Sequence, residues 1–264
     1  MRMRAVLTPR TLTRYAVAWC YLAAFCVTEV VYALLPARDQ NAVLAWASTN
    51  VHNIVHDPVG CMIASAFFAP GALTAWPILI ALAMFGANHV LGNWRTAVTC
   101  IAGHVIGTLV SEGIVWYQIL HHTQPASARF ILDIGPSYVV VTAIAVGLIW
   151  GGWLARSAAA IALAVLIFIG QIFSGLSRLQ LSAVGHTTAL FVGCTLGSFL
   201  AWQIRRAPGP GTGAPGAGAP GTGAPPRARR GLAALGAAPD GPAVVSPDGE
   251  VSLPEPDQGQ NSAG

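Results

Sequence analysis

The sequence predicts an all-α protein, a polytopic membrane helical bundle with six transmembrane helices. This prediction depends on a low content of charged residues, six long apolar segments and an uneven distribution of arginines. Charged residues make up 9% of the chain and apolar residues 54%, whereas a soluble domain usually carries about 25% charged residues. The chain therefore has too little polar surface to face water on all sides.

The six apolar segments are long enough, or nearly so, to cross a bilayer. A helix needs roughly 20 apolar residues to cross about 30 Å of hydrocarbon. Residues 36–72 mix polar and charged positions with short apolar stretches, so this segment is too polar to span. We expect it either at the membrane interface, partly re-entrant, or as an ordinary extramembrane loop. The expected spans are residues 15–35, 73–92, 97–119, 134–153, 157–174 and 183–203.

The arginines that flank these spans indicate an orientation. With six spans, eight arginines fall on one side of the membrane and three on the other. Basic residues favour the cytoplasmic side of a membrane, so the group of eight predicts a multi-pass protein of the cell membrane with both termini in the cytoplasm. Arg38, Arg129 and Arg178 fall on the other side. The net charge of +4 reflects this flanking pattern, so the expected partner is the lipid bilayer and no nucleic acid. The larger group is Arg2, Arg4, Arg10, Arg14, Arg95, Arg156, Arg205 and Arg206.

The composition changes abruptly after Arg206, where Pro, Gly and Ala repeats begin. A segment of this composition cannot bury a hydrophobic core. The sequence therefore predicts a transmembrane domain over residues 1–206 and a disordered Pro/Gly/Ala-rich cytoplasmic tail over residues 207–264.

Ionisable residues inside the expected spans are candidates for function, because burying them in lipid is costly. Glu29, His104, Glu112 and His186 lie within spans, and Asp133 lies at the start of one. Hydrogen bonding between helices is the plainer explanation for Glu29 and His104, whereas Glu112 lies deep enough to reach the same chamber as His186. The five cysteines lie in or beside apolar segments without CxxC spacing, so no metal site is expected.

Ser137 and His186 are the candidate catalytic residues. Each lies about four residues inside an expected span, and both spans run in the same direction. At about 1.5 Å rise per residue, both side chains lie roughly 5 Å below the outer membrane boundary. An imidazole can take the proton of a serine hydroxyl and activate it as a nucleophile. A structural hydrogen bond within the bundle is the alternative reading for each residue.

The residues around this pair resemble the rhomboid family of intramembrane serine proteases. Gly135-Pro-Ser137-Tyr resembles the family's GxSx motif, and Gly185-His186, with glycines seven and eleven residues after the histidine, resembles its final helix. The segment Gly92-Asn-Trp-Arg95 resembles the family's glycine–arginine turn. The resemblance covers residues 14–203 and is closest to the actinobacterial rhomboid-like membrane proteins. In those proteins an Asn-rich stretch and a Ser-Ala-Phe segment precede the second span. Residues 48–53 and 65–67 of this chain resemble these two segments.

This resemblance implies a Ser–His protease that cleaves membrane-anchored polypeptides near the outer membrane boundary. Ser137 would be the nucleophile and His186 the general base and then the acid, with no metal or organic cofactor. Two departures from the family pattern bear on activity. Active members place a His, and an Asn four residues later, near the start of the second span, where the two help to stabilise the oxyanion. Residues 72–77 of this chain, the corresponding segment, contain neither. Tyr138 replaces a common glycine, where its ring would crowd helix packing or the substrate path.

Three functions are therefore weighed from the sequence. The first is an intramembrane serine protease, and the second is a catalytically inactive rhomboid-fold protein that binds transmembrane segments of client proteins. The third is a small transporter, which ranks last because no inverted repeat or pair of broken helices is detectable. The oligomeric state is not specified by the sequence.

Overall fold

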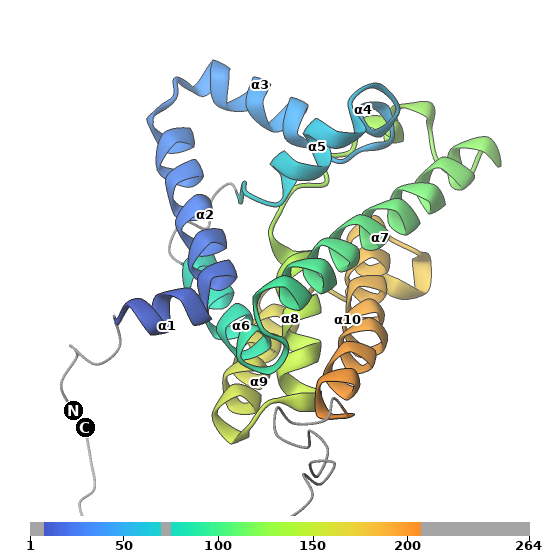
Figure 1. The fold of residues 1–264 in the computed structure, drawn as a ribbon. Coiled ribbons are helices and arrows are strands. Elements are labelled where there is room, and N and C mark those ends of the chain that lie inside the picture. The colour runs from blue at the N-terminus through green and yellow to red at the C-terminus, as the bar shows by residue number, and fades with distance from the viewer. Residues whose placement is uncertain (1–7, 70–74, 207–264) are drawn as a thin grey trace, which may run out of the picture. The chain divides into compact units, whose positions relative to one another are not determined.

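The computed structural model describes residues 8–69 and 75–206. Every regular element in these ranges is helical, which confirms the all-α prediction (Figure 1). The expected tail, residues 207–264, and the first residues of the expected second span lie outside the described residues. The longer helices are α2 (Ala16–Leu34), α6 (Ala75–Leu91), α7 (Asn93–Leu120), α8 (Ser137–Trp150), α9 (Trp153–Phe168) and α10 (Leu181–Arg206). The shorter elements are α1 (Pro9–Arg14), α3 (Ala37–Ala47), α4 (Val51–His56), α5 (Pro58–Ser65), η2 (Ala126–Phe130) and η3 (Leu176–Arg178).

The six longer helices match the six expected spans in order and approximate position. Three of them, α2, α7 and α10, are long and apolar enough to cross a membrane. The other three are apolar but shorter, and α8 has only 14 residues. That length covers about 21 Å at 1.5 Å per residue, less than the roughly 30 Å of hydrocarbon. The count of six spans therefore stays a prediction.

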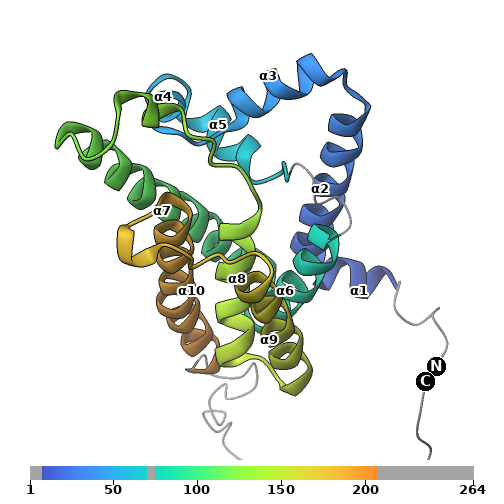
Figure 2. The ribbon, with the colours of Figure 1, turned by 180° about the vertical axis from the view of Figure 1, so that it is seen from behind.

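Helix α8 lies at the centre of the bundle and packs against α6, α7, α9 and α10 (Figures 1 and 2). Every residue from Tyr138 to Gly147 is buried. A helix that is apolar all round is suited to such a position. Small residues let neighbours approach closely: a Cβ at Gly103 of α7 or Gly193 of α10 would collide with Thr142 of α8.

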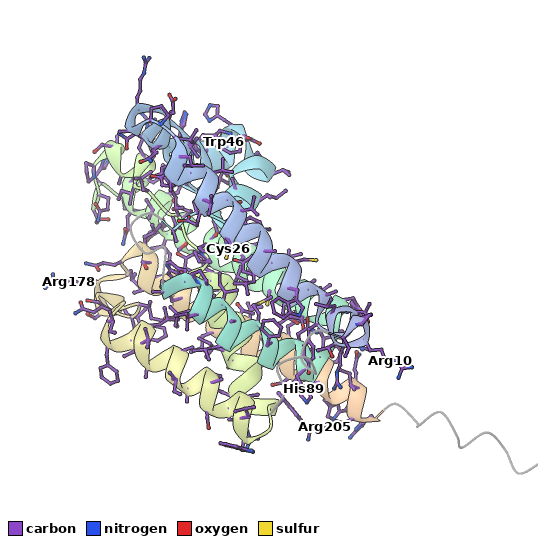
Figure 3. All side chains as sticks on the ribbon, turned by 90° about the vertical axis from the view of Figure 1, so that its left-hand side faces the viewer. Arg10, Cys26, Trp46, His89, Arg178 and Arg205 are labelled. Atoms are coloured by element: carbon purple, nitrogen blue, oxygen red, sulfur yellow. The ribbon has the colours of Figure 1, made fainter. Side chains whose placement is uncertain are left out.

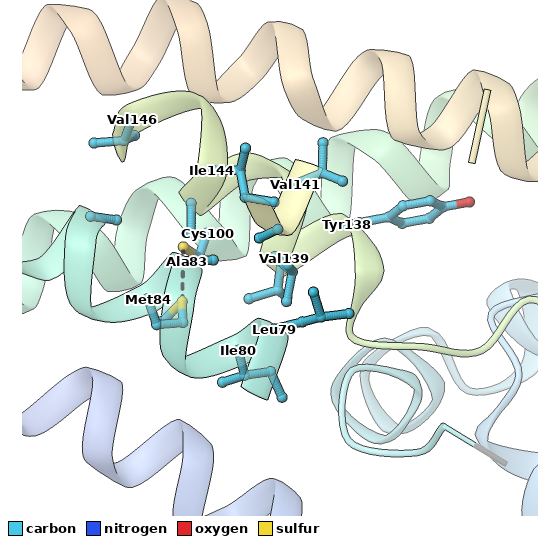
Figure 4. Close-up of a cluster of buried hydrophobic side chains, with 14 of the residues drawn as sticks. Leu79, Ile80, Ala83, Met84, Cys100, Tyr138, Val139, Val141, Ile144 and Val146 are labelled. Carbon is cyan, nitrogen blue, oxygen red and sulfur yellow. Dashed lines mark hydrogen bonds between the residues drawn. The ribbon is translucent and has the colours of Figure 1, made fainter. Parts of the chain in front are cut away.

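The core lies between α8 and α6 (Figure 4). Val139, Val141 and Ile144 of α8 belong to one buried cluster with Leu79 and Met84 of α6. Burial of this kind is worth about 1.5–3 kcal/mol for each fully buried aliphatic side chain in water. In a bilayer the tails are themselves apolar, so close packing stabilises the bundle more than removal from water does.

Residues 36–69 include three short helices at one end of the bundle, and none of them is long enough to span a membrane (Figure 1). The place of this segment at the membrane interface stays a prediction. Asn50 caps α4 by accepting a hydrogen bond from Asn53 N at 2.9 Å, and Asp57 caps α5 through Gly60 N at 2.9 Å. Such caps satisfy amide groups that the first helical turn leaves without partners. Helices α8 and α10 both begin towards this end and run in the same direction, as the positions of Ser137 and His186 require (Figure 2).

Candidate active site

Ser137 is the first residue of α8. Gly135 has φ +149, a region that favours glycine, and Pro136 occupies the N-cap position. The preceding loop is tied to the 48–65 region by a bond from Gly135 N to Ser65 O at 3.0 Å. Ser137 is only partly buried. The loop thus presents the serine at a helix N-terminus, where the first backbone N–H groups have no acceptor within the helix.

His186 is buried near the start of α10, with 4% of its surface exposed. Its Nδ1 lies 3.1 Å from Ile172 O and 3.1 Å from Ser182 Oγ. A carbonyl oxygen can only accept, so Nδ1–H donates to Ile172 and Nε2 carries a lone pair. Nε2 is buried and has no hydrogen-bond partner among the described residues. The histidine is therefore held in the tautomer that a general base needs.

No hydrogen bond joins Ser137 to His186, since Nε2 has no partner and Nδ1 bonds elsewhere. The residue in contact with the imidazole is Tyr138, whose ring meets it edge-on at 4.9 Å between centroids and 75° between planes. The paired Ser–His arrangement expected from helix depth thus brings the neighbour of Ser137, and not its hydroxyl, against His186.

Tyr138 occupies a niche between two glycines. A Cβ at Gly185 of α10 would lie 2.6 Å from Cε1 of the Tyr138 ring, and one at Gly107 of α7 would lie 3.5 Å from Cδ2. Glycines on both facing helices make room for the ring, so it does not crowd the helix packing; crowding of the substrate path stays a prediction.

Asp133 connects this ring to the short helices at the end of the bundle. Tyr138 O–H donates to both carboxylate oxygens at 3.3 Å, and Thr49 Oγ1 lies 3.4 Å from Oδ2. Asp133 N donates to Ser48 Oγ at 2.9 Å. Withdrawal from water raises the pKa of Asp133 to about 6, although the hydrogen bonds from Tyr138 and Thr49 lower it in part. Sequence reasoning missed this network; the short Asp133–Tyr138 spacing across a Gly-Pro turn was the available signal.

The other candidate residues lie in different surroundings. His104 Nε2 donates to Met62 O at 2.9 Å, and Glu29 Oε1 accepts from Ala69 N at 2.6 Å. Both therefore bond between elements, as the plainer explanation predicts. Glu112 is buried and lines a cavity of about 240 Å³ beside α4, with Val51 and Trp116.

Asn53, one of the side chains that could replace a missing oxyanion donor, is committed elsewhere. Asn53 Nδ2 donates to the carbonyls of Ala45 at 2.7 Å and Ser48 at 2.8 Å. Of the start of α6, the described residues 75–77 contain neither His nor Asn. The described part of the chain also holds no group of three or more His, Cys, Asp or Glu side chains that could bind a metal ion.

The fold and the site define a helical membrane protein with a serine at a helix N-terminus and a buried histidine in a basic tautomer. The family model of the rhomboid-like proteins matches residues 12–201, well over half of the chain. The chain therefore belongs to the rhomboid-like protein family and is a multi-pass membrane protein. This match confirms the family that the motifs around Ser137 and His186 indicated. No curated protein and no solved structure matches the chain.

Proposed function

We propose that this chain is an intramembrane serine protease that cleaves membrane-anchored polypeptides near the outer boundary of the cell membrane. The observation that carries the proposal is the unpartnered, buried Nε2 of His186, held as a lone-pair acceptor by the bond from Nδ1 to Ile172 O. A buried polar atom without a partner is costly and needs an explanation. Six other buried side-chain atoms of the described residues, including His104 Nδ1, also lack a partner, so Nε2 of His186 is singled out by its fixed tautomer and by the contact of its ring with Tyr138, the residue after Ser137. The proposal includes six spans with both termini in the cytoplasm.

In this mechanism, His186 Nε2 takes the proton of the Ser137 hydroxyl as its oxygen attacks the scissile carbonyl. The Ile172 carbonyl stabilises the imidazolium that forms, because it accepts from Nδ1–H at 3.1 Å. His186 then gives the proton to the leaving amine, and water hydrolyses the acyl-enzyme by the same path in reverse order. The Ser137 hydroxyl must come within hydrogen-bond distance of Nε2 when substrate binds, since catalytic contacts often tighten only in the complex.

The oxyanion would be stabilised by backbone groups. The first N–H of α8 to be used within the helix is that of Val140, which donates to Pro136 O at 2.9 Å. The N–H groups of Ser137, Tyr138 and Val139 precede it, and a helix N-terminus favours negative charge. Loss of one oxyanion donor typically costs about 10²–10³ in rate, so turnover slower than that of family members with the His and Asn pair is expected.

A catalytically inactive protein that binds transmembrane clients is the second candidate. Two observations favour it: Ser137 and His186 share no hydrogen bond, and Asn53 is bonded to backbone carbonyls. In this reading the His186–Tyr138 contact is structural, and the fold holds a client helix without cutting it.

A serine-directed fluorophosphonate probe, applied to the full chain in native membranes and in detergent, separates the two candidates. We expect labelling of the wild type that is lost in both Ser137→Ala and His186→Ala. Ser157→Ala is the matched control, because Ser157 is an exposed serine on α9 and should label like the wild type. Wild-type labelling no higher than that of folded Ser137→Ala would sink the protease proposal and leave the client-binding candidate.

A further inference from the structure

One cavity lined by described residues lies between α6 and α9, and neither Ser137 nor His186 belongs to its lining. It has a volume of about 890 Å³, and its lining includes Pro77 and Phe85 of α6 and Leu154 and Ala158 of α9. Helices α6 and α9 pack side by side, and Figure 3 shows the face of the bundle on which α2, α6 and α9 lie. The groove is lined mainly by apolar side chains, and Tyr15 and His89 belong to its lining as well.

The length of the groove matches one leaflet of a membrane. Pro77 and His89 lie twelve residues apart on α6, both within its lining. This spacing corresponds to about 18 Å of helix, while half of a bilayer's hydrocarbon core is about 15 Å. A chain of hydrocarbon that enters at the His89 end thus has room to extend to the middle of the membrane.

Tyr15 and His89 of this lining form a polar cluster with Arg14 at the end of α6. His89 Nδ1 lies 2.8 Å from Tyr15 Oη and 3.4 Å from an Arg14 guanidinium nitrogen. The Tyr15 and His89 rings stack at 6.2 Å, and Arg14 Cζ lies 5.5 Å from the centre of the Tyr15 ring. Because Arg14 can only donate, Nδ1 accepts and the proton lies on Nε2. The cluster therefore offers an imidazole N–H and the remaining guanidinium N–H groups, all of them donors.

The charge around the cluster excludes a cationic ligand. The basic residues Arg10, Arg95 and Arg205 belong to helix ends at the same end of the bundle, and Figure 3 labels Arg10, His89 and Arg205 towards that end. None of the acidic residues among 8–69 and 75–206 lies in the helix ends that meet there. They are placed in the later part of α2 and α7, in α3, and in the loops before α5 and α8: Glu29, Asp39, Asp57, Glu112 and Asp133.

We infer that the α6–α9 groove binds a phospholipid with an anionic headgroup, whose phosphate lies at Arg14 and His89 and one of whose acyl chains lies along α6. The hydrogen-bond donors of Arg14 and His89 suit an anion, and the apolar lining of the groove is about as long as one leaflet. A lipid uses both features, whereas a free anion would leave the groove unfilled. Exposed Trp153 at the start of α9 suits the headgroup level, where tryptophan is enriched. The inference does not depend on Ser137 or His186.

Native mass spectrometry of the full chain tests this inference with two probes, dioleoyl phosphatidylglycerol and dioleoyl phosphatidylcholine. We expect the protein to retain phosphatidylglycerol preferentially. Arg14→Gln should reduce that preference about fivefold, the effect of one basic residue at a membrane surface. Arg129→Gln removes one arginine at the opposite end of the bundle and should leave the preference unchanged. His89→Gln repeats the test without removing a formal charge, and should also lower retention.

The apolar wall is tested by filling the groove. Ala81 lines the cavity, so Ala81→Phe should lower retention of phosphatidylglycerol, whereas Ala160→Phe, on exposed α9 surface outside the lining, should not. Size-exclusion chromatography identifies the folded variants. Equal preference in Arg14→Gln, His89→Gln and Arg129→Gln would overturn the inference. Equal retention of both lipids, or cross-linking of position 81 to a client helix in place of lipid, would overturn it as well.

Discussion

Substitution of Gly185 by alanine should destabilise the bundle, although alanine normally stabilises a helix. The new Cβ would lie 2.6 Å from Cε1 of the Tyr138 ring and closer still to the hydroxyl end. Overpacking of this kind costs about 1–3 kcal/mol. Displacement of the ring would also weaken its edge-on contact with His186, worth about 0.5–1.5 kcal/mol. Against these costs stands a gain of about 1 kcal/mol in helix propensity, so the net expectation is a loss of about 1–3 kcal/mol.

Gly113 supplies the matched control for this substitution. It lies within α7, and a Cβ there would meet no atom within 4 Å. Gly113→Ala should therefore stabilise the protein by about 0.5–1 kcal/mol. The free energy of unfolding would be measured by titration with sodium dodecyl sulfate in mixed micelles. A Gly185→Ala variant as stable as Gly113→Ala would refute the placement of the Tyr138 ring between α7 and α10.

A double-mutant cycle identifies the ring as the cause. In a Tyr138→Ala background the obstacle is gone, so Gly185→Ala should cost nothing or stabilise slightly. The coupling free energy between the two positions should then be about 1–4 kcal/mol, above the few tenths expected for independent sites. Additive effects would mean that the loss arises elsewhere in α10.

Three further predictions concern Asp133, Asn88 and the orientation. The folded pKa of Asp133 is raised to about 6 from 3.8, so its contribution to stability is present at low pH and is lost as pH rises from about 4 through 6. In Asp133→Asn, the free energy of unfolding should therefore depend less on pH over this window. An unchanged pH profile would contradict the raised pKa of Asp133. Asn88 Oδ1 accepts from Ala18 N at 3.3 Å and Nδ2 donates to Arg14 O at 3.1 Å, so Asn88→Ala should cost about 1–3 kcal/mol in the same titration; a loss below about 0.5 kcal/mol would show that these bonds contribute little. Alkaline phosphatase fused at Gln124 should be active and a fusion after Arg206 inactive, and the reverse pattern would reject the proposed orientation.

Hydropathy predicted the order of the long helices well and their ends poorly. Helix α8 begins at Ser137 and not at 134, since Gly135 and Pro136 form the turn before it, and Gly151 ends it. The sequence could not distinguish the buried α8 from helices that face lipid. Both environments are apolar, so composition carries no signal for which helix is central. Glycines such as Gly193 hint at close packing, but their partner Thr142 is known only from the structure.

The positions of Ser137 and His186 along the chain were predictable, but the rotation of their helices was not, and their depth in a membrane stays a prediction. Counting residues placed Ser137 and His186 near the starts of two parallel helices, which is where they lie. Successive residues of a helix differ by about 100° around the axis, and depth says nothing of this angle. The structure directs Tyr138 towards His186 and bonds it to Asp133, and these contacts depend on the loop at residues 131–136 and on two glycines. Such contacts have no periodic signature in a single sequence.

His186 and His89 show how one residue type can be set to opposite roles by the partner of a single nitrogen. A carbonyl at Nδ1 of His186 leaves Nε2 as an acceptor, whereas the Arg14 guanidinium at Nδ1 of His89 leaves Nε2 as a donor. The spacing of His89 and Asn93 matches the oxyanion pair of active rhomboids, but Asn93 accepts from Val17 N at 3.3 Å at the start of α2. The pair therefore cannot serve the chemistry at the other end of the bundle. A donor histidine beside arginine suits an anion instead. His186→Ala should therefore remove fluorophosphonate labelling and leave the retention of phosphatidylglycerol intact. His89→Gln should lower that retention and leave the labelling intact.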